Sequence, residues 1–335
     1  MSSILKSGIL GRLNLLIFRL YIMNVLIVGG TRFQGLYLVD ELIKSEHNVT
    51  VFHRGKHSIN SRPGLIDITG DRDNSVALKR LSDFEYDVCI DTCAYFPGQI
   101  DKLSKAVLIK KYCLISSVYT YRDQFTKLKE TSDLINITGQ IPKEVTSENY
   151  GALKVLCEHS AYSNFGNECL IIRPSVIIGP GDHTERMSLW IHIVSTSHIL
   201  LAPGDLSRTI QFVDVRDLAK FTIKLIMDSR SGAINVTGRK YSFQDFIEIL
   251  SGLCGDTCKT HRLGWNQFKR CGLDNLPFCN NNKSEDYQNN LARSWGFKER
   301  NLAESMYDIY EHNKGSRISQ KKYHELEAKI LKLFS

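Results

Sequence analysis

Short apolar runs alternate with longer amphipathic stretches through the first half of the chain. The apolar runs predict strands within 25–28, 48–54, 64–71, 86–95, 111–118 and 168–179. Apolar residues at helical spacing predict helices within 33–47, 74–84, 97–111 and 147–166. Strands joined by helices favour a parallel sheet covered on both faces, which is the doubly wound α/β arrangement. The polar stretch before 147 is longer than an ordinary connection, so we expect it to be functional.

Beyond Gly179 the alternation loosens. A strand and a helix are predicted within 203–229, a strand within 233–238 and a helix within 242–255. We interpret 23–178 as the core of the fold and 179–313 as a smaller C-terminal lobe interwoven with it. Residues 1–22 are interpreted as an N-terminal extension, and 314–335 predict a basic C-terminal helix.

The formal charge of +7 lies at the two ends of the chain. Residues 1–22 carry +3 and residues 314–335 carry +4, so the stretch between them is neutral. A neutral core argues against nucleic acid as a partner. The first 22 residues are either an extension that precedes a natural start of the protein at Met23 or an organelle targeting segment. The apolar run within them is too short to span a membrane. The nine cysteines lack zinc-site spacing, so we expect reduced thiols, no metal site and a cytoplasmic protein.

A glycine-rich turn links the first predicted strand to the first predicted helix. The stretch VLIVGGTRFQG places Gly29 and Gly30 directly after the strand and Gly35 where the helix begins. Glycines allow a tight turn, and a helix N-terminus offers free N–H groups to a phosphate. This position in a βαβ unit predicts a dinucleotide site. Arg32 occupies the place of a middle glycine, and we expect its guanidinium to lie along the phosphates or the adenosine.

The end of the second predicted strand carries basic residues instead of the acid that is typical of an NAD site. The sequence FHRGKH supplies His53, Arg54, Lys56 and His57. A carboxylate would repel a ribose 2′-phosphate, whereas an arginine can bind it in a bidentate manner. The pattern therefore favours NADP over NAD, with Arg54 as a ligand and Arg32 as a second cation; NAD stays the alternative.

A serine, a tyrosine and a lysine follow in an order that suits proton transfer. Tyr150 and Lys154 are four positions apart on a predicted helix and share one face. An ammonium group favours a phenolate, so we expect Lys154 to lower the pKa of Tyr150 and let it relay a proton. Ser117, at the end of the fifth predicted strand, can hydrogen-bond the reacting oxygen. Together they indicate a site for proton transfer at a reacting oxygen.

At this point the sequence resembles a known family. GGTRFQG, GDRD, ISSVYTY, YGALK, IIRPSVIIGPGD and FVDVRDLA are similar to the extended short-chain dehydrogenase/reductases, the NAD(P)-dependent epimerase/dehydratase family. The similarity spans roughly 23–313 and is strongest to an atypical Gly-Gly-Thr-Arg-Phe branch that includes chloroplast stem-loop-binding proteins.

The resemblance implies a Rossmann-like core and a role for each site residue. Tyr150 would be the catalytic acid/base, Lys154 would hold the nicotinamide ribose and Ser117 would orient the substrate. Asp71 and Arg72 would lie near the adenine, and Pro174 near the nicotinamide. The cofactor contacts expected in full are Gly29, Gly30, Thr31, Arg32, Phe33, Gly35, Arg54, Asp71, Arg72, Thr92 and Pro174.

Two departures from the family pattern narrow the activity. Ile210 stands where nucleotide-sugar members have an arginine, with Arg208 two residues earlier, which puts nucleotide sugars in doubt as substrates. Val118 and Tyr119 stand where a dehydratase would have an Asp–Glu pair. We therefore expect oxidation, reduction or epimerisation of a small molecule at a hydroxyl or carbonyl carbon. A sugar or a nucleotide sugar is the substrate class that the family resemblance leaves open.

The alternatives are an RNA-binding protein on the same fold and an NADP sensor without turnover. A homodimer is left open, and no membrane partner is expected.

Overall fold

The computed structural model describes residues 22–123, 127–197, 199–253, 259–270, 272–273, 276–279 and 284–314. The predicted N-terminal extension and basic C-terminal helix therefore lie outside the described residues, apart from Ile22 and Lys314. Within the described ranges, no helix is both long enough and apolar enough to cross a membrane.

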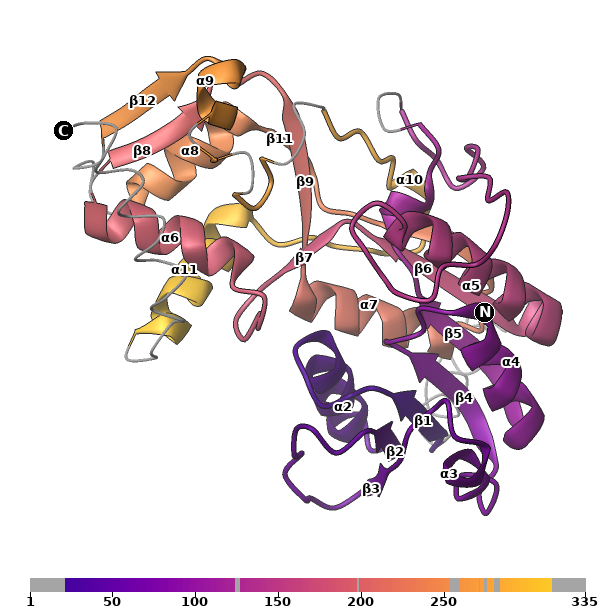
Figure 1. Ribbon diagram of the computed structural model, residues 1–335. Helices are drawn as coiled ribbons and strands as arrows, with labels where there is room; N and C mark the ends of the chain where they lie inside the picture. The colour runs from indigo at the N-terminus through magenta and orange to yellow at the C-terminus, as the bar shows by residue number, and fades with distance from the viewer. Residues whose placement is uncertain are drawn as a thin grey trace, which may run out of the picture.

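A seven-stranded parallel sheet forms the centre of the molecule (Figure 1). Its order is β10-β6-β5-β4-β1-β2-β3, and every neighbouring pair is parallel. The predicted fold class, a Rossmann-like doubly wound sheet, is confirmed. The strands are β1 (Asn24–Val28), β2 (Asn48–His53), β3 (Leu65–Thr69), β4 (Tyr86–Asp91), β5 (Ile109–Ile115), β6 (Cys169–Pro174) and β10 (Gly232–Val236).

Helices cover both faces of this sheet because its strands are apolar on both sides. Val25 and Ile27 of β1 pack with α2 (Gln34–Lys44), α7 (Val215–Met227) and α10 (Asn290–Ser294). Leu26 and Val28 point the other way, toward α3 (Ser75–Lys79), α4 (Pro97–Ala106) and α5 (Tyr150–Phe165). Successive side chains of a strand alternate between faces, so one short apolar run serves both cores.

The C-terminal lobe has two small sheets and its own core. One sheet pairs β7 (Val176–Ile178), β9 (Thr209–Asp214) and β11 (Lys240–Ser242), and the other pairs β8 (Ile199–Pro203) with β12 (Lys259–Leu263). Trp190, Phe243 and Phe246 fill the lobe's core. Its helices are α6 (Arg186–Ser197), α8 (Phe243–Gly252), α9 (Trp265–Arg270) and α11 (Leu302–Asn313). Figure 1 shows β7 and β9 running between the lobe and the main sheet.

Some predicted strands end earlier than expected. The predicted strand 168–179 is two strands, because β6 ends at Pro174 and β7 joins a different sheet. The apolar run continues through this break, so periodicity alone does not reveal it. β5 ends at Ile115, and Ser117 caps a short 3₁₀ helix, η1 (Val118–Thr120), by accepting the N–H of Tyr119. A second 3₁₀ turn, η2 (Gly166–Glu168), follows α5.

Candidate active site

A cleft of about 1000 Å³ lies at the carboxyl ends of the parallel strands. Residues at or just beyond the ends of β1, β2, β4, β5 and β6 line it, on both sides of the β1–β4 boundary. Ligands of open α/β sheets bind at this switch point, and the volume is at the upper end for ligand pockets. Every predicted site residue except Gly35 lines this cleft.

The turn between β1 and α2 has a backbone that requires glycine. Gly29 and Gly30 have φ of +106° and +80°. A Cβ on Gly29 would lie 2.1 Å from Thr92 Oγ1, and one on Gly35 would lie 2.6 Å from the Cα of Gly30. Gly35 does not line the cleft, but the absence of a side chain there lets α2 pack closely against the turn.

The start of α2 leaves polar groups free for a ligand. Phe33, just before the helix, has φ +38°, a costly conformation for an aromatic residue that is found mainly at functional sites. No side chain in the described ranges caps this helix N-terminus. The N–H groups of Gly35 and Leu36 donate to the carbonyls of Arg32 and Phe33, so the N–H of Gln34 is the first-turn donor left for a phosphate within the described structure. The buried Oε1 of Gln34 has no partner in the described structure and can accept a hydrogen bond from a ligand. The turn thus fits a dinucleotide.

Four basic side chains from the loops after β1 and β2 line the cleft. Arg32, Arg54, Lys56 and His57 all line it and are exposed. Asp71, also exposed, lines the same region after β3. The structure therefore brings the predicted cations from two separate loops to one place, with a donor set that fits a phosphate.

A hydrogen-bonded histidine shapes the loop that carries Arg54. His53 Nδ1 accepts the N–H of Gly55 at 3.1 Å, which leaves the proton on Nε2 to bond Asp67 at 2.6 Å. The sequence did not reveal this pairing, because Asp67 lies on β3, 14 residues away.

Arg72 lines the cleft, as the predicted contact with adenine requires, and it is also paired with a buried acid. Its guanidinium forms two hydrogen bonds with Asp91, at 2.8 and 2.6 Å, and both side chains are buried. Tyr112 also donates to Asp91, at 2.7 Å. Arg72 holds the pKa of Asp91 below its usual range, against the effect of burial. Arg72 therefore ties the loop after β3 to the end of β4.

Ser117, Tyr150 and Lys154 meet at the other end of the cleft. Ser117 and Tyr150 both line the cleft, and the Ser117 hydroxyl acts to lower the pKa of the Tyr150 phenol. Lys154 Nζ donates to the carbonyls of Ala94 and Ile115 at 2.9 and 2.8 Å. An ammonium group has three N–H donors, so one is left for a ligand hydroxyl.

The expected lowering of the Tyr150 pKa is wrong for this structure. Burial raises the pKa of Tyr150, and the Ser117 hydrogen bond and the charge of Arg186 only partly oppose it. The ammonium of Lys154 acts instead on Tyr95, whose ring centroid is 5.2 Å away. Tyr150 is therefore a protonated phenol at neutral pH.

A buried ion pair below the site fixes the catalytic helix. Glu158 lies one turn after Lys154 and binds Arg173 of β6 through two hydrogen bonds, at 3.0 and 2.6 Å. Ser116, next to Ser117, donates to the same carboxylate at 2.5 Å. Arg173 also donates to Tyr121 at 3.1 Å. The network holds α5, β5 and β6 in register and so places Ser117 against Tyr150.

The sequence reasoning missed several residues that line the substrate end of the cleft. Tyr119, Ser175, His183 and Arg186 lie there. The Oγ of Ser175 is buried and has no hydrogen-bond partner in the described structure. The only sequence signal was their proximity to the motifs ISSVYTY and RPSVIIGPGDHTER.

Ile210 stands where nucleotide-sugar members of the family have an arginine, and Arg208 lies two residues earlier. Neither residue lines the cleft. Ile210 is buried in the lobe's core. Arg208 is also buried; its guanidinium lies 4.0 Å from the centroid of the Phe243 ring and donates to the carbonyl of Phe278.

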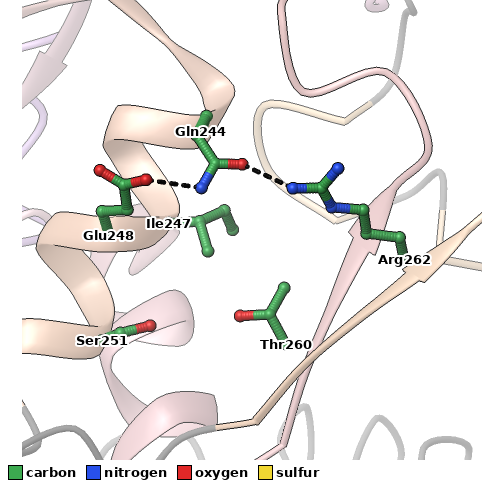
Figure 2. Close-up of a pocket in the computed structure, with 6 residues that line it drawn as sticks. All are labelled: Gln244, Ile247, Glu248, Ser251, Thr260 and Arg262. Carbon is green, nitrogen blue, oxygen red and sulfur yellow. Dashed lines mark hydrogen bonds between the residues drawn. The ribbon is translucent and has the colours of Figure 1, made fainter.

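A second hollow, of about 340 Å³, lies on the lobe between α8 and β12 (Figure 2). Gln244 there donates to Glu248 at 2.6 Å and accepts from Arg262 at 3.0 Å. The charged groups of this hollow are already bridged to one another, and none of the predicted site residues lies in it. The large cleft is therefore the candidate active site.

Comparison with known proteins agrees with this geometry. Residues 99–237, which include Ser117, Tyr150 and Lys154, match the NAD dependent epimerase/dehydratase family. This part of the chain is therefore similar to the epimerase/dehydratase family. The resemblance found in the sequence is thus confirmed.

The chain is also similar to a protein from a plant. The chain is 26% identical to the chloroplast stem-loop binding protein of 41 kDa b from Arabidopsis thaliana over 235 residues. The match covers 65% of this chain and 59% of that protein, so the chain spans less than two thirds of the relative's length.

Solved epimerases share the fold of the whole described molecule. UDP-glucuronic acid 4-epimerase from Bacillus cereus, solved with NAD, has a TM-score of 0.68 at 18% identity over 88% of this chain and 99% of its own. UDP-glucose 4-epimerase from Thermotoga maritima, solved with UDP-glucose, has a TM-score of 0.66 at 16% identity over 88% of this chain and 99% of its own. At this identity the likeness establishes the fold.

Proposed function

We propose that this protein is an NADP-dependent oxidoreductase of the extended short-chain type, acting at a hydroxyl or carbonyl carbon of a small molecule. The observation that carries the proposal is a single cleft that joins a phosphate-binding turn to Ser117, Tyr150 and Lys154. A glycine turn alone would serve nucleotide binding, and a tyrosine–lysine pair alone is common on helices. Their meeting in one cleft provides both a cofactor site and a proton-transfer group.

The chain's own residues would hold the cofactor along the cleft. The N–H of Gln34 at the start of α2 would bind the pyrophosphate, and the third N–H of Lys154 would bind the nicotinamide ribose. The bound nicotinamide supplies or accepts a hydride. Ser117 orients the substrate oxygen beside the Tyr150 phenol, which moves the proton.

The protonation state of Tyr150 favours carbonyl reduction. A phenol with a raised pKa holds its proton at neutral pH and can donate it to an oxygen that gains negative charge. Alcohol oxidation would need the phenolate, which burial disfavours. Tyr150 is therefore suited to act as a general acid.

The basic residues around the adenosine end support NADP as the cofactor. Arg32 and Arg54 reach this end from two loops, and an exposed guanidinium can bind a 2′-phosphate with two parallel hydrogen bonds. Solved neighbours from Bacillus cereus and Bordetella bronchiseptica contain NAD, which supports a nicotinamide cofactor in general.

RNA binding is the second candidate, and the plant relative's name is the observation that favours it. The neutral charge of 23–313 weighs against this candidate. A protein that follows an RNA backbone should lose affinity steeply with salt, whereas a dinucleotide held mainly in a cleft should lose little.

The proposal is tested by screening carbonyl compounds for NADPH oxidation and then comparing Tyr150→Phe with Tyr307→Phe on the substrate found. Tyr307 is an exposed tyrosine on α11 and serves as the matched control. Tyr150→Phe should lower turnover by about 10²–10⁴, the usual contribution of a positioned acid, with NADPH affinity unchanged. Full activity in Tyr150→Phe would refute the assigned role.

A further inference from the structure

Arg186, the first residue of α6, offers a guanidinium to the substrate end of the cleft. It lines the cleft, and its side chain is 34% exposed. Nη2 donates to the carbonyl of Ile177 at 3.1 Å, which fixes the direction of the group. Nη1 makes no hydrogen bond to any residue that the structure describes, so this side of the guanidinium is available to a ligand.

The acid beside Arg186 pairs with it only weakly. Nε and Nη2 of Arg186 both lie 3.4 Å from one oxygen of Asp182, long for charge-assisted hydrogen bonds. The other oxygen of Asp182 accepts from the backbone and hydroxyl of Thr184, at 3.0 and 2.6 Å. Asp182 therefore forms its shorter hydrogen bonds with Thr184 in its own turn. The Nη1 side of Arg186 is left available to a ligand.

Arg186 lies close to the proton-transfer group. Its charge lowers the pKa of both the Tyr150 and the Tyr119 phenols, against the larger effect of burial. On its other side, the pKa of His183 is lowered first by burial, and then by the charges of Arg32 and Arg186. Arg186, Tyr150 and His183 line the same cleft, and the His183 ring lies 6.4 Å from the ring of Phe33 in the turn before α2.

The lobe contributes little other positive charge to this cleft. Among the described residues after Pro174, Arg186 is the one arginine or lysine that lines it. Arg208, the other candidate near this lobe, is buried over Phe243. Ser175 adds a buried hydroxyl without a partner in the described structure. One cation and one hydroxyl suit a single anionic group.

We propose, on the basis of the function proposed above, that Arg186 binds a carboxylate or phosphate that the substrate carries near its reacting carbon, with Ser175 as a second donor. The planar guanidinium matches either oxyanion with paired hydrogen bonds. A neutral substrate would displace water from Arg186 without offering an anionic partner in its place. This desolvation cost would make neutral substrates bind less well than anionic ones.

The first test separates this site from the cofactor site. NADPH affinity is measured by its fluorescence for wild type, Arg186→Gln and the exposed control Arg239→Gln. NADPH should bind all three equally. A loss of about tenfold or more in Arg186→Gln alone, the size of one charged hydrogen bond, would assign Arg186 to the cofactor phosphates and overturn the proposal.

The second test asks whether Arg186 binds an anion. Phenylglyoxal labelling of Arg186 is followed by mass spectrometry in the NADPH-loaded protein, with acetate, inorganic phosphate or chloride at equal ionic strength. Acetate or phosphate should slow the labelling by about tenfold relative to chloride, and Ser175→Ala should weaken this protection. Stronger protection by acetate would indicate a carboxylate substrate, and stronger protection by phosphate would indicate a phosphate substrate. Equal labelling in all three salts would refute the site.

The same labelling without NADPH distinguishes the two proposals. If wild type fails to bind NADPH, the proposed function is wrong, yet protection of Arg186 by acetate or phosphate would still establish an anion site. If NADPH binds and no anion protects Arg186, the oxidoreductase proposal stands and the anion site is wrong.

Discussion

Glu285 should make the stability of this protein fall as the pH rises from about 4.5 to 7. Its carboxylate is largely buried beside β9 and accepts the N–H of Gln211 at 2.8 Å. It forms no ion pair within the described ranges, and Arg208 opposes its burial only from a distance. Burial raises the pKa of Glu285 from the ordinary 4.5 to about 7.

The sign and size follow from proton linkage. The folded state holds the Glu285 proton more tightly than the unfolded state, so the contribution is fully present below pH 4.5 and is lost as the pH rises through 7. A shift from 4.5 to about 7, at about 1.4 kcal/mol per unit, amounts to about 3 kcal/mol. Glu285→Gln keeps an oxygen for the Gln211 N–H and removes the ionisation.

Urea unfolding from pH 4.5 to 8 measures this effect as a difference between variant and wild type, so that other titrating groups cancel. Glu285→Gln should match wild type at pH 4.5 and exceed its free energy of unfolding by about 3 kcal/mol above pH 7. Glu248→Gln, at an exposed carboxylate on α8, should show no such trend. A difference that stays constant across this range would show that Glu285 is not a buried, protonated acid.

Three further substitutions test other parts of the account. Arg54→Ala should weaken NADPH by about tenfold to a hundredfold and leave NADH nearly unchanged, and titration calorimetry would reject the 2′-phosphate role if both cofactors weakened equally. Asp91→Asn should cost about 3–5 kcal/mol in urea unfolding because it leaves buried Arg72 unpaired, and a cost below about 1 kcal/mol would contradict the pairing. Gly151→Ala should lower the free energy of unfolding, because a Cβ there would lie 2.1 Å from a backbone oxygen. Gly98→Ala should raise it by about 0.5–1 kcal/mol, because a Cβ there would have nothing within 4 Å. Equal effects of the two substitutions on the free energy of unfolding would refute this packing.

The sequence was informative where local chemistry decides the structure. The apolar runs of β1 and β2 and the glycines between β1 and α2 determine a strand, a turn and a helix within one stretch of chain. The break at Ser175 was not predictable in this way. The run RPSVIIG is apolar on both sides of it, and the strands that follow pair with partners far along the chain.

Contacts across the sheet explain most of what the sequence left open at the site. The family resemblance implied a place near the adenine for Arg72, and its pairing with Asp91 was not foreseen because Asp91 comes within reach only when β4 is in position. The pKa of Tyr150 depends on its burial and on Ser117 and Arg186, which a helical spacing to Lys154 cannot show. The lobe's short strands, β8, β11 and β12, carry no clear alternation, and so the two small sheets were not predicted.

The most direct test of the central claim is a calorimetric titration of the purified protein with NADPH at low and high salt. The account predicts one site per chain with a dissociation constant of about micromolar, in the range usual for cofactors and substrates, and a much smaller loss of affinity with salt than RNA binding would show. No detectable NADPH or NADH binding, together with RNA binding that weakens steeply as salt rises, would contradict it and favour the RNA-binding alternative.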